Sequence, residues 1–376
     1  MIRTEAIDDL AALEPHAQAW NRLCLEARHC NPQQSHAWVA THLEHRLEPG
    51  QAWCCFLAWE DDRLIGVLPL IAGSTARTLQ APQDPHTHTG DAVLAPGREA
   101  IALAPLLAAA ARRYPKHIRI EFPRLAADSP TPAACTAGPS GWKATVRYAG
   151  SGYYLPIQGS FDHYRASLSG NFRSNLNKAA RKLGKLPHVT TEFLSGAAAS
   201  PELLPRFMEV EARSWKGTEG TAILNSPSEV AFYRTLVRRL AAAGWLEWHL
   251  LNAGEKTIAA NLAVRFNSAV VVWKLGYDAG YAKCSPGSML FERLVRHAYD
   301  SGAIREINLL TDYAWYQQWR MQPRPYSCVR AFPPRPAARL AWLADLARQS
   351  AGRSRVIRSL WTLSRDPRPA PHPARS

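Results

Sequence analysis

Apolar positions recur with two different periods along the first 150 residues. Spacings of three and four residues predict helices at 16–29, 35–47 and 98–113, the second capped by Ser35. Compact apolar runs predict strands at 53–60, 63–73, 117–122, 143–150 and 152–157. The first two of these strands are predicted to form a hairpin that turns at Asp61 and Asp62. The segment 123–141 is rich in Pro, Ala, Ser and Gly, which predicts a surface loop.

The same alternation continues after residue 150. Helical spacing predicts helices at 161–169, 171–183, 201–217, 228–244 and 286–302. Apolar runs predict strands at 188–194, 245–254, 256–266, 269–278 and 305–311. The order of helix pair, antiparallel meander, helix and strand indicates an α+β or mixed α/β fold. The two halves show a similar order of elements, which permits an old duplication.

Length and order together suggest three segments. At 376 residues the chain is long enough for two or three domains. We predict a first domain at 1–150, a second at 151–334 and a C-terminal tail at 335–376.

Composition is that of a globular protein, with 47% hydrophobic and 20% charged residues. The first 20 residues hold no apolar signal-peptide core, and no stretch reaches the roughly 20 apolar residues of a membrane span. The seven cysteines show no CxxC spacing and no even-numbered framework. We therefore expect a cytoplasmic protein.

The net charge of +14 is concentrated in the tail. From Arg335 onward the chain contains nine arginines and only two acidic residues, Asp345 and Asp366, which gives a net charge of +7. The rest of the chain is only mildly basic, which argues against a broad nucleic-acid surface. Leucines at helical spacing in 337–363, with Gly352 between two short helices, suggest peripheral attachment to the inner face of a membrane. The alternative is that the first helix docks on the body.

The segment WKLGYDAGYAKCSPGSMLFERL is the most informative for chemistry. A strand ends at Tyr277 and Asp278, and a helix starts at Ser285, Pro286 and Gly287. Unpaired N–H groups at a helix start favour an anion such as a pyrophosphate. An ordinary capped helix explains the same residues.

A carboxylate and an aromatic residue share a predicted helix face in RFMEVEARSWKG. Glu211 and Trp215 are four residues apart, and a carboxylate beside an aromatic ring can act as a general base. A solvated glutamate beside a core tryptophan is the alternative.

Two further segments carry charged or metal-binding residue types. In NFRSNLNKAARKL, Arg173 and several lysines surround an apolar stripe, which is either a solvated face or a rim that attracts an anion. In QDPHTHTGD, Asp84, His86, His88 and Asp91 lack the spacing of a metal site. We expect no metal and interpret this segment as a polar loop lining a cleft.

An ordered series of segments carries a family resemblance from about residue 20 to 320. The series is NPQQSHAW, GVLPL, FRSNLNKAARKL, the Glu211–Trp215 segment, IAANLAV, WKLGYDAGYAKCSPGSML and LLTDYAWYQQW. It resembles the CelD-type acetyltransferases of the GNAT superfamily, relatives of the FemAB peptidoglycan aminoacyltransferases. Its strongest element is the aromatic strand with Lys274 and Asp278 that leads into Ser285.

The resemblance implies tandem GNAT-like domains, each a mixed, mostly antiparallel sheet flanked by helices, with a degenerate first half and the site in the second. It implies that the pyrophosphate of acyl-CoA binds at the start of the helix after the fourth strand. The implied site residues are Glu211, Asp278 and Lys274 for catalysis, Ser285, Pro286, Gly287 and Ser288 for acyl-CoA, and Trp215, Lys216, Tyr277, Asp312 and Arg173 for the acceptor.

Two positions depart from the family pattern. The Gln/Arg-x-x-Gly-x-Gly/Ala phosphate loop of ordinary GNAT enzymes is replaced by KCSPGS. Tyr316 stands where CelD-type relatives often carry a lysine soon after the Asp312 position. If that lysine contacts the donor or the acceptor in the family, its replacement bears on the choice of substrate.

Three hypotheses follow. The first is an enzyme that transfers an acyl group, typically acetyl, from acyl-CoA to an amine of a sugar, sugar nucleotide or amino-acid-derived acceptor in polysaccharide or envelope synthesis. It needs no permanently bound cofactor, and Glu211 or Asp278 would be its base. The second replaces the donor with an aminoacyl-tRNA, as in FemAB relatives. The third is a catalytically degenerate GNAT scaffold.

Overall fold

The computed structural model describes residues 1–27, 30–73, 77–137 and 141–363, with side chains described to residue 350. The strands of the first half are β1 (Ile2–Ile7), β2 (Ala52–Glu60), β3 (Arg63–Ala72), β4 (Thr78–Gln80), β5 (Val93–Leu94), β6 (Arg119–Ala126) and β7 (Lys143–Pro156). Its helices are α1 (Leu10–Leu13), η1 (Glu14–His16), α2 (Ala17–Glu26), η2 (Pro32–Gln34), α3 (His36–His45), α4 (Glu99–Arg113) and α5 (Thr131–Thr136).

The second half has more helix. Its strands are β8 (Val189–Ser195), β9 (Leu246–Ala253), β10 (Lys256–Phe266), β11 (Ala269–Tyr277), β12 (Glu306–Asn308) and β13 (Gln322–Phe332). Its α-helices are α6 (Phe161–Ser167), α7 (Gly170–Leu183), α8 (Leu204–Ala212), α9 (Trp215–Thr218), α10 (Pro227–Ala242), α11 (Pro286–Ser301) and α12 (Pro336–Leu363). Its 3-10 helices are η3 (Gly196–Ala198), η4 (Pro201–Leu203), η5 (Ile223–Asn225), η6 (Ala279–Cys284) and η7 (Ala314–Trp319).

The two halves repeat one topology within a 13-stranded sheet. From one edge the order is β1-β2-β3-β4-β6-β13-β7, and from the other it is β8-β9-β10-β11-β12-β7-β13. In each half the fourth and fifth positions are a parallel pair, β4 with β6 and β11 with β12, connected through α4 or α11. The prediction of two tandem α/β halves is confirmed.

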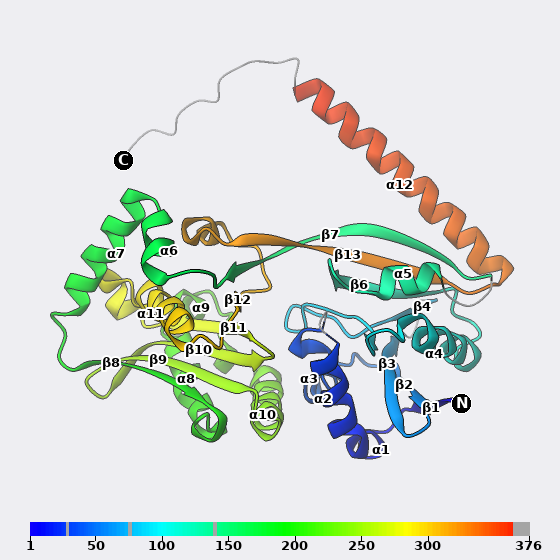
Figure 1. The fold of residues 1–376 in the computed structure, drawn as a ribbon, viewed down its shortest axis with the longest axis horizontal. Helices are drawn as coiled ribbons and strands as arrows, with labels where there is room; N and C mark the ends of the chain where they lie inside the picture. The colour runs from blue at the N-terminus through cyan, green and yellow to red at the C-terminus, as the bar shows by residue number, and fades with distance from the viewer. Residues whose placement is uncertain (28–29, 74–76, 138–140, 364–376) are drawn as a thin grey trace.

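The long strands β7 and β13 tie the halves together. They pair antiparallel, and Figure 1 shows them running together across the top of both halves. β7 also pairs with β12 of the second half, whereas β13 pairs with β6 of the first. Each half therefore completes its sheet with a strand from the other. The predicted domain division near residue 150 falls inside β7.

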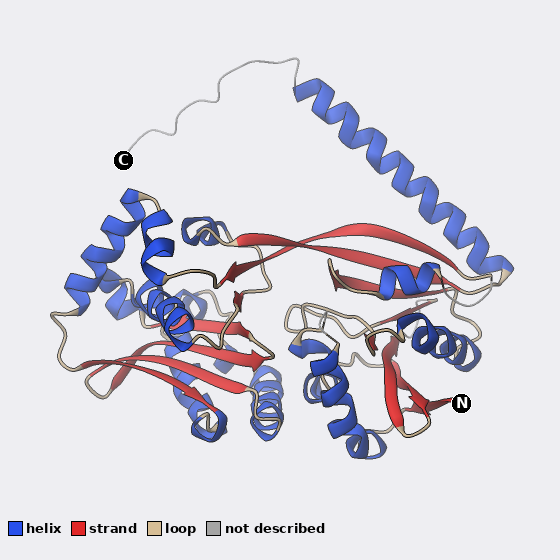
Figure 2. Ribbon diagram, in the orientation of Figure 1, coloured by secondary structure: helices blue, strands red, loops and turns tan. Residues whose placement is uncertain are grey.

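Helices cover both faces of the second half's strands (Figure 2). On one face, α6, α7 and α11 enclose a core that includes Leu176, Leu290 and Leu294. On the other, α8 and α10 pack into a core that continues into the first half. The rings of Trp38 and Trp273 meet edge to face at 4.4 Å across this junction. Such a pair stabilises by about 1 kcal/mol beyond its apolar burial.

Several predicted elements differ from the structure. The loop at 123–141 contains the end of β6 and the helix α5, and the two strands at 143–157 are one strand, β7. The helix at 201–217 is broken into η4, α8 and α9 because the chain turns at Ser214, whose side chain caps α9. Gly352 does not separate two helices, since α12 is continuous. The strands β1, β4, β5 and β13 were not predicted.

The first turns of α12 dock on the β7–β13 ribbon through one buried carboxylate. Asp345 accepts hydrogen bonds from Arg147 at 2.5 Å, from Arg330 at 2.7 Å and from the Thr145 hydroxyl at 2.7 Å. These partners hold the pKa of Asp345 below its usual range despite burial. This part of the helix thus lies on the body, as the alternative to membrane attachment expects.

The outer face of the same turns is apolar. Leu340, Leu343 and Leu346 follow one another at three-residue intervals and are exposed, Leu340 by 69%. Within the described residues, no helix is long and apolar enough to cross a membrane. The rest of the predicted tail, 364–376, lies outside the described residues.

Candidate functional site

The strands β11 and β12 separate in the middle of the second half. They pair only from Ala269 with Glu306 to Val271 with Asn308, whereas β11 continues to Tyr277. Trp273 is an extra residue in the pairing of β11 with β10, so it forms a β-bulge. A bulge bends its strand and re-aims the neighbouring side chains. Beyond Val271, β11 therefore remains paired with β10 as far as Tyr277 but leaves its edge toward β12 unpaired.

Lys274 follows this bulge and is half-buried. Its ammonium lies 5.6 Å from the centroid of the Tyr233 ring, which belongs to α10. Burial lowers the pKa of Lys274 to about 8, and the charge of Lys216 acts in the same direction, although Glu211 and Glu229 oppose it. Lys274 is thus a cation near neutral pH with an appreciable neutral fraction.

Glu211 is buried, only 1% exposed, and both carboxylate oxygens are occupied. One accepts a hydrogen bond from Lys216 Nζ at 2.7 Å and the other from the backbone N–H of Ile223 at 3.0 Å. Lys216 also donates to the Leu275 carbonyl at 3.0 Å, which ties the pair to β11. A Cβ on Gly276 would lie 2.9 Å from Glu211 Cα, so the glycine permits α8 to approach β11 this closely.

The predicted pairing of Glu211 with Trp215 on one helix face is wrong. α8 ends at Ala212, and Trp215 begins the separate helix α9 with its side chain 50% exposed. The side chain that pairs with Glu211 is instead Lys216, which follows Trp215 in the sequence. The break removes the helical spacing on which the pairing rested.

Asp278 is engaged in structure at the end of β11. It caps η6 by accepting from the Gly280 N–H at 2.9 Å, and it forms an ion pair with Lys256 at 2.8 Å. Lys256, the Gly280 bond and Arg213 hold the pKa of Asp278 below its usual value, although burial raises it. A carboxylate held in its charged form by these partners is a poor proton acceptor.

The start of α11 offers backbone donors close to the separated strand. Ser285 precedes the helix in a left-handed conformation, with φ of 46°, and its side chain does not form the predicted cap. Pro286 has no N–H group, so Gly287 and Ser288 present the first helical amides. A Cβ on Gly287 would lie 3.5 Å from Tyr277 Cδ1, which places Tyr277 beside this turn.

The remaining predicted residues lie around this region. Arg173 is half-buried on α7, which packs against η6 and α11. Asp312 is exposed in the turn after β12. Tyr316, at the position of the missing lysine, is buried and shares a 2.5 Å hydrogen bond with the Thr311 hydroxyl. The structure groups Glu211, Lys216 and Lys274, and separately groups Tyr277 with the start of α11.

The sequence did not single out the residues that surround Lys274 from α10 and the first half. Tyr233 and Glu229 lie one turn apart on α10, inside an ordinary amphipathic pattern. His86 was noticed as a possible metal ligand, but the structure places it against Tyr233, with Nδ1 2.8 Å from the phenol oxygen. The His88 ring lies 5.0 Å from that of Trp273. Only the histidine-rich loop gave a signal.

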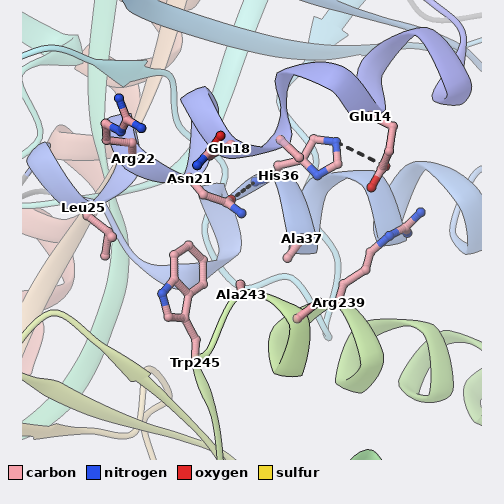
Figure 3. Close-up of a pocket in the computed structure, with 12 residues that line it drawn as sticks. Glu14, Gln18, Asn21, Arg22, Leu25, His36, Ala37, Arg239, Ala243 and Trp245 are labelled. Atoms are coloured by element: carbon pink, nitrogen blue, oxygen red, sulfur yellow. Dashed lines mark hydrogen bonds and ion pairs between the residues drawn. The ribbon is translucent and has the colours of Figure 1, made fainter. Parts of the chain in front are cut away.

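A groove of about 500 Å³ lies elsewhere on the junction of the halves, between α2, α3 and the end of α10. Figure 3 shows Asn21, His36 and Glu14 from the first half facing Arg239 and Trp245 from the second. None of its twelve lining residues belongs to the predicted site. This groove therefore contains neither the part of β11 that leaves β12 nor the half-buried Lys274.

A sequence comparison finds a family match within the second half. Residues 170–320 match the model of a family described as an acetyltransferase (GNAT) domain. No curated protein matches the chain by sequence.

Solved structures extend the likeness to most of the chain. FemX is 12% identical, with a TM-score of 0.57 over 86% of this chain and 96% of that chain. The C-terminal domain of a candidate lysylphosphatidylglycerol synthetase from Agrobacterium fabrum is 11% identical, with a TM-score of 0.52 over 89% and 96%. A protein of unknown function from Bacteroides thetaiotaomicron is 13% identical, with a TM-score of 0.50 over 88% and 100%.

Because the sequence identities are this low, the solved structures show only that the first half shares their fold. The family match, together with the tandem topology, supports a GNAT acetyltransferase domain at residues 170–320.

Proposed function

We propose that the protein transfers an acyl group, most simply acetyl, from acyl-CoA to the amine of a sugar, sugar nucleotide or amino-acid-derived acceptor. The observation that carries the proposal is the juxtaposition on one strand, β11, of a half-buried lysine and an edge left unpaired by β12, beside a helix start. The family match over the same residues agrees with it. Polysaccharide or envelope synthesis would supply such acceptors.

The donor would bind where β11 and β12 separate. The amides of Gly287 and Ser288 and the positive end of the α11 dipole would hold the pyrophosphate, with Ser285 and Pro286 shaping the turn. The pantetheine arm would lie along the unpaired edge of β11, where backbone groups can bond to its amides. This places the thioester toward Lys274.

Lys274 is the proposed proton acceptor. The acceptor's amine nitrogen attacks the thioester carbonyl carbon, and its proton passes to the neutral amine of Lys274. The tetrahedral intermediate then expels the CoA thiolate, which takes the proton back from Lys274 and leaves as the thiol. Because Glu211 has both oxygens occupied, its proposed role is to hold Lys216 and the local charge balance. Asp278 is assigned to the turn into η6 rather than to the base.

The donor site is tested by thermal unfolding with CoA, acetyl-CoA, a long-chain acyl-CoA and tRNA, in wild type and Gly287→Val. A ligand at 100 times its Kd stabilises the fold by about 2.7 kcal/mol, so an acyl-CoA should raise Tm by a few degrees. The valine side chain at position 287 adds a branched group beside Tyr277 at the phosphate turn. It should weaken the affinity for acyl-CoA at least tenfold, and the rise in Tm should become smaller accordingly. A folded Gly287→Val protein with unchanged affinity would exclude this donor site.

An aminoacyl-tRNA is the second candidate donor. The fold likeness to FemX and the missing GNAT phosphate loop favour it. The modest charge outside the tail disfavours it, because tRNA binding requires many phosphate contacts. Stabilisation by tRNA that falls steeply between 50 and 200 mM salt, with none by acyl-CoA, would support this donor. Stabilisation by neither ligand would leave the scaffold hypothesis.

We also propose contact with an anionic membrane through 337–363. Full-length protein should co-sediment with liposomes in proportion to their anionic lipid at low salt, because the tail carries +7 and each basic residue near such a surface adds about 1 kcal/mol. Replacing Leu340, Leu343 and Leu346 by Ser removes the exposed apolar face but keeps the charge and the Asp345 contacts. Equal sedimentation of this variant and wild type would contradict apolar insertion.

A further inference from the structure

A rigid loop of the first half reaches the second half beside Lys274. The loop joins β4 to β5, and Asp84 fixes its tip by accepting from the backbone N–H of His86 at 2.8 Å and of Thr87 at 2.5 Å. The Thr87 hydroxyl lies 3.0 Å from His42 Nδ1 and accepts from Trp38 Nε1 at 3.2 Å, both on α3. These bonds leave the tip, and so the His86 ring, little freedom to move.

His86 connects this tip to two residues of α10. Its Nδ1 lies 2.8 Å from the Tyr233 hydroxyl, and its Nε2 lies 3.4 Å from Glu229. Glu229 also accepts from Arg46 of the first half at 2.7 Å. The imidazole therefore completes a bridge in which both of its nitrogens have partners from the second half.

The far side of the bridge is Lys274, which has the face of the Tyr233 ring beside its ammonium. The charged groups that act on it come from several elements: Lys216 from α9, Glu211 from α8, Glu229 from α10 and Arg46 from the end of α3. Lys274 acts in turn on His86 and on His88. Both halves thus build the surroundings of the proposed base.

We infer that His86 is a positioning residue for the reaction of the second half, holding Tyr233 and Glu229 in place around the Lys274 amine and keeping water from it. The inference rests on the proposed function. It makes the first half a working part of the catalytic centre, in contrast to the degenerate module that the family resemblance implied.

The charge state of His86 fits this role. Burial lowers its pKa to about 4, and Lys274 acts in the same direction, so the ring is neutral near pH 7. A neutral ring can accept the Tyr233 proton at Nδ1 and donate its own proton from Nε2 to Glu229. Burial also raises the pKa of Tyr233 well above its usual value, so the phenol keeps the proton that this arrangement needs. His86 therefore excludes water without adding a charge.

The test measures the titration of Lys274 itself and needs no acceptor. Full-length protein is pulse-labelled with acetic anhydride from pH 5 to 11, and the labelling of Lys274 is followed by mass spectrometry. Wild type should give a midpoint near pH 8. His86→Ala admits water and frees Tyr233, so its midpoint should rise by about one unit or more. His86→Asn keeps an amide at the Nδ1 position and should shift the midpoint of Lys274 less. His163 is exposed, so His163→Ala is the matched control.

The outcomes separate the inference from the proposed function. A folded His86→Ala protein whose Lys274 midpoint matches wild type would overturn the positioning role while the proposed base stands. A wild-type midpoint near that of a free lysine would overturn both. If His86→Ala does not fold, Tyr233→Phe keeps the ring and removes only the hydroxyl bonded to His86. The inference then requires a raised midpoint in Tyr233→Phe, and an unchanged one overturns it.

Discussion

Lys274→Met should lower acetyl-CoA turnover by about 100-fold or more, the usual effect of removing a general base. Methionine fills a similar volume beside Tyr233 and carries no titrating group, so the fold and donor binding should be retained. The assay is release of the CoA thiol with an amino sugar as the acceptor, and acetyl-CoA affinity is measured separately. Lys178→Met, on the exposed face of α7, is the matched control.

The pH dependence of the turnover rate is a second test of Lys274 as the general base. A base acts when deprotonated, and the pKa of Lys274 is lowered to about 8. The wild-type rate should therefore rise about tenfold per pH unit below pH 8 and level off above it, and the residual rate of Lys274→Met should lack this limb. A wild-type rate that is flat from pH 6 to 9 would exclude Lys274 as the base and return attention to the carboxylates.

The pattern of apolar residues was sufficient to predict those strands and helices whose positions depend on local sequence spacing. The meander β9–β10–β11 and the helix α11 lie close to their predicted ranges because each buries a regular stripe or an apolar run. β13 was missed because Pro323, Pro325 and two arginines interrupt its apolar pattern. It is a strand because the other half offers it two partners, β6 and β7, and such pairing leaves no local trace in the sequence.

The candidate site was predictable only where it follows one segment of chain. Lys274 and the start of α11 lie twelve residues or fewer apart, so a single motif could indicate both. The pairing of Glu211 with Trp215 failed because helical spacing was assumed across Ser214, where the chain leaves the helix. His86 and Tyr233 are 147 residues apart, and they meet because the halves pack together, with α3 against α10.

The strand exchange gives a physical reason why both halves belong to one site. β7 and β13 each complete the other half's sheet, and the α3–α10 contact adds a second junction below them (Figure 1). A change in the relative position of the halves would have to move the loop that carries His86 away from α10. The surroundings of Lys274 are thus sensitive to the whole fold, not to the second half alone.

Removing one member of the Glu211–Lys216 pair should cost about 3 kcal/mol of unfolding free energy, because a buried charge would lose its partner. The side chains are 1% and 15% exposed, and Glu211 also bonds to the Ile223 amide. Glu211→Gln and Lys216→Met should each be strongly destabilising in urea titration. The double variant should lose less than the sum of the single losses, since neither charge is then left alone.

Turnover by the wild type, the two single variants and the double variant distinguishes two roles of Glu211, charge balance and general base. If Glu211 only balances charge around Lys274, the double variant should recover a large part of the turnover that Glu211→Gln loses. If Glu211 is itself the base, the double variant stays as inactive as the single one, because glutamine cannot take the amine proton. Glu209→Gln is the matched control: Glu209 lies two residues earlier on α8, is 60% exposed and forms a surface ion pair with Arg213. Strictly additive losses of stability would mean that Glu211 and Lys216 do not depend on each other, and the balance assigned to them would be wrong.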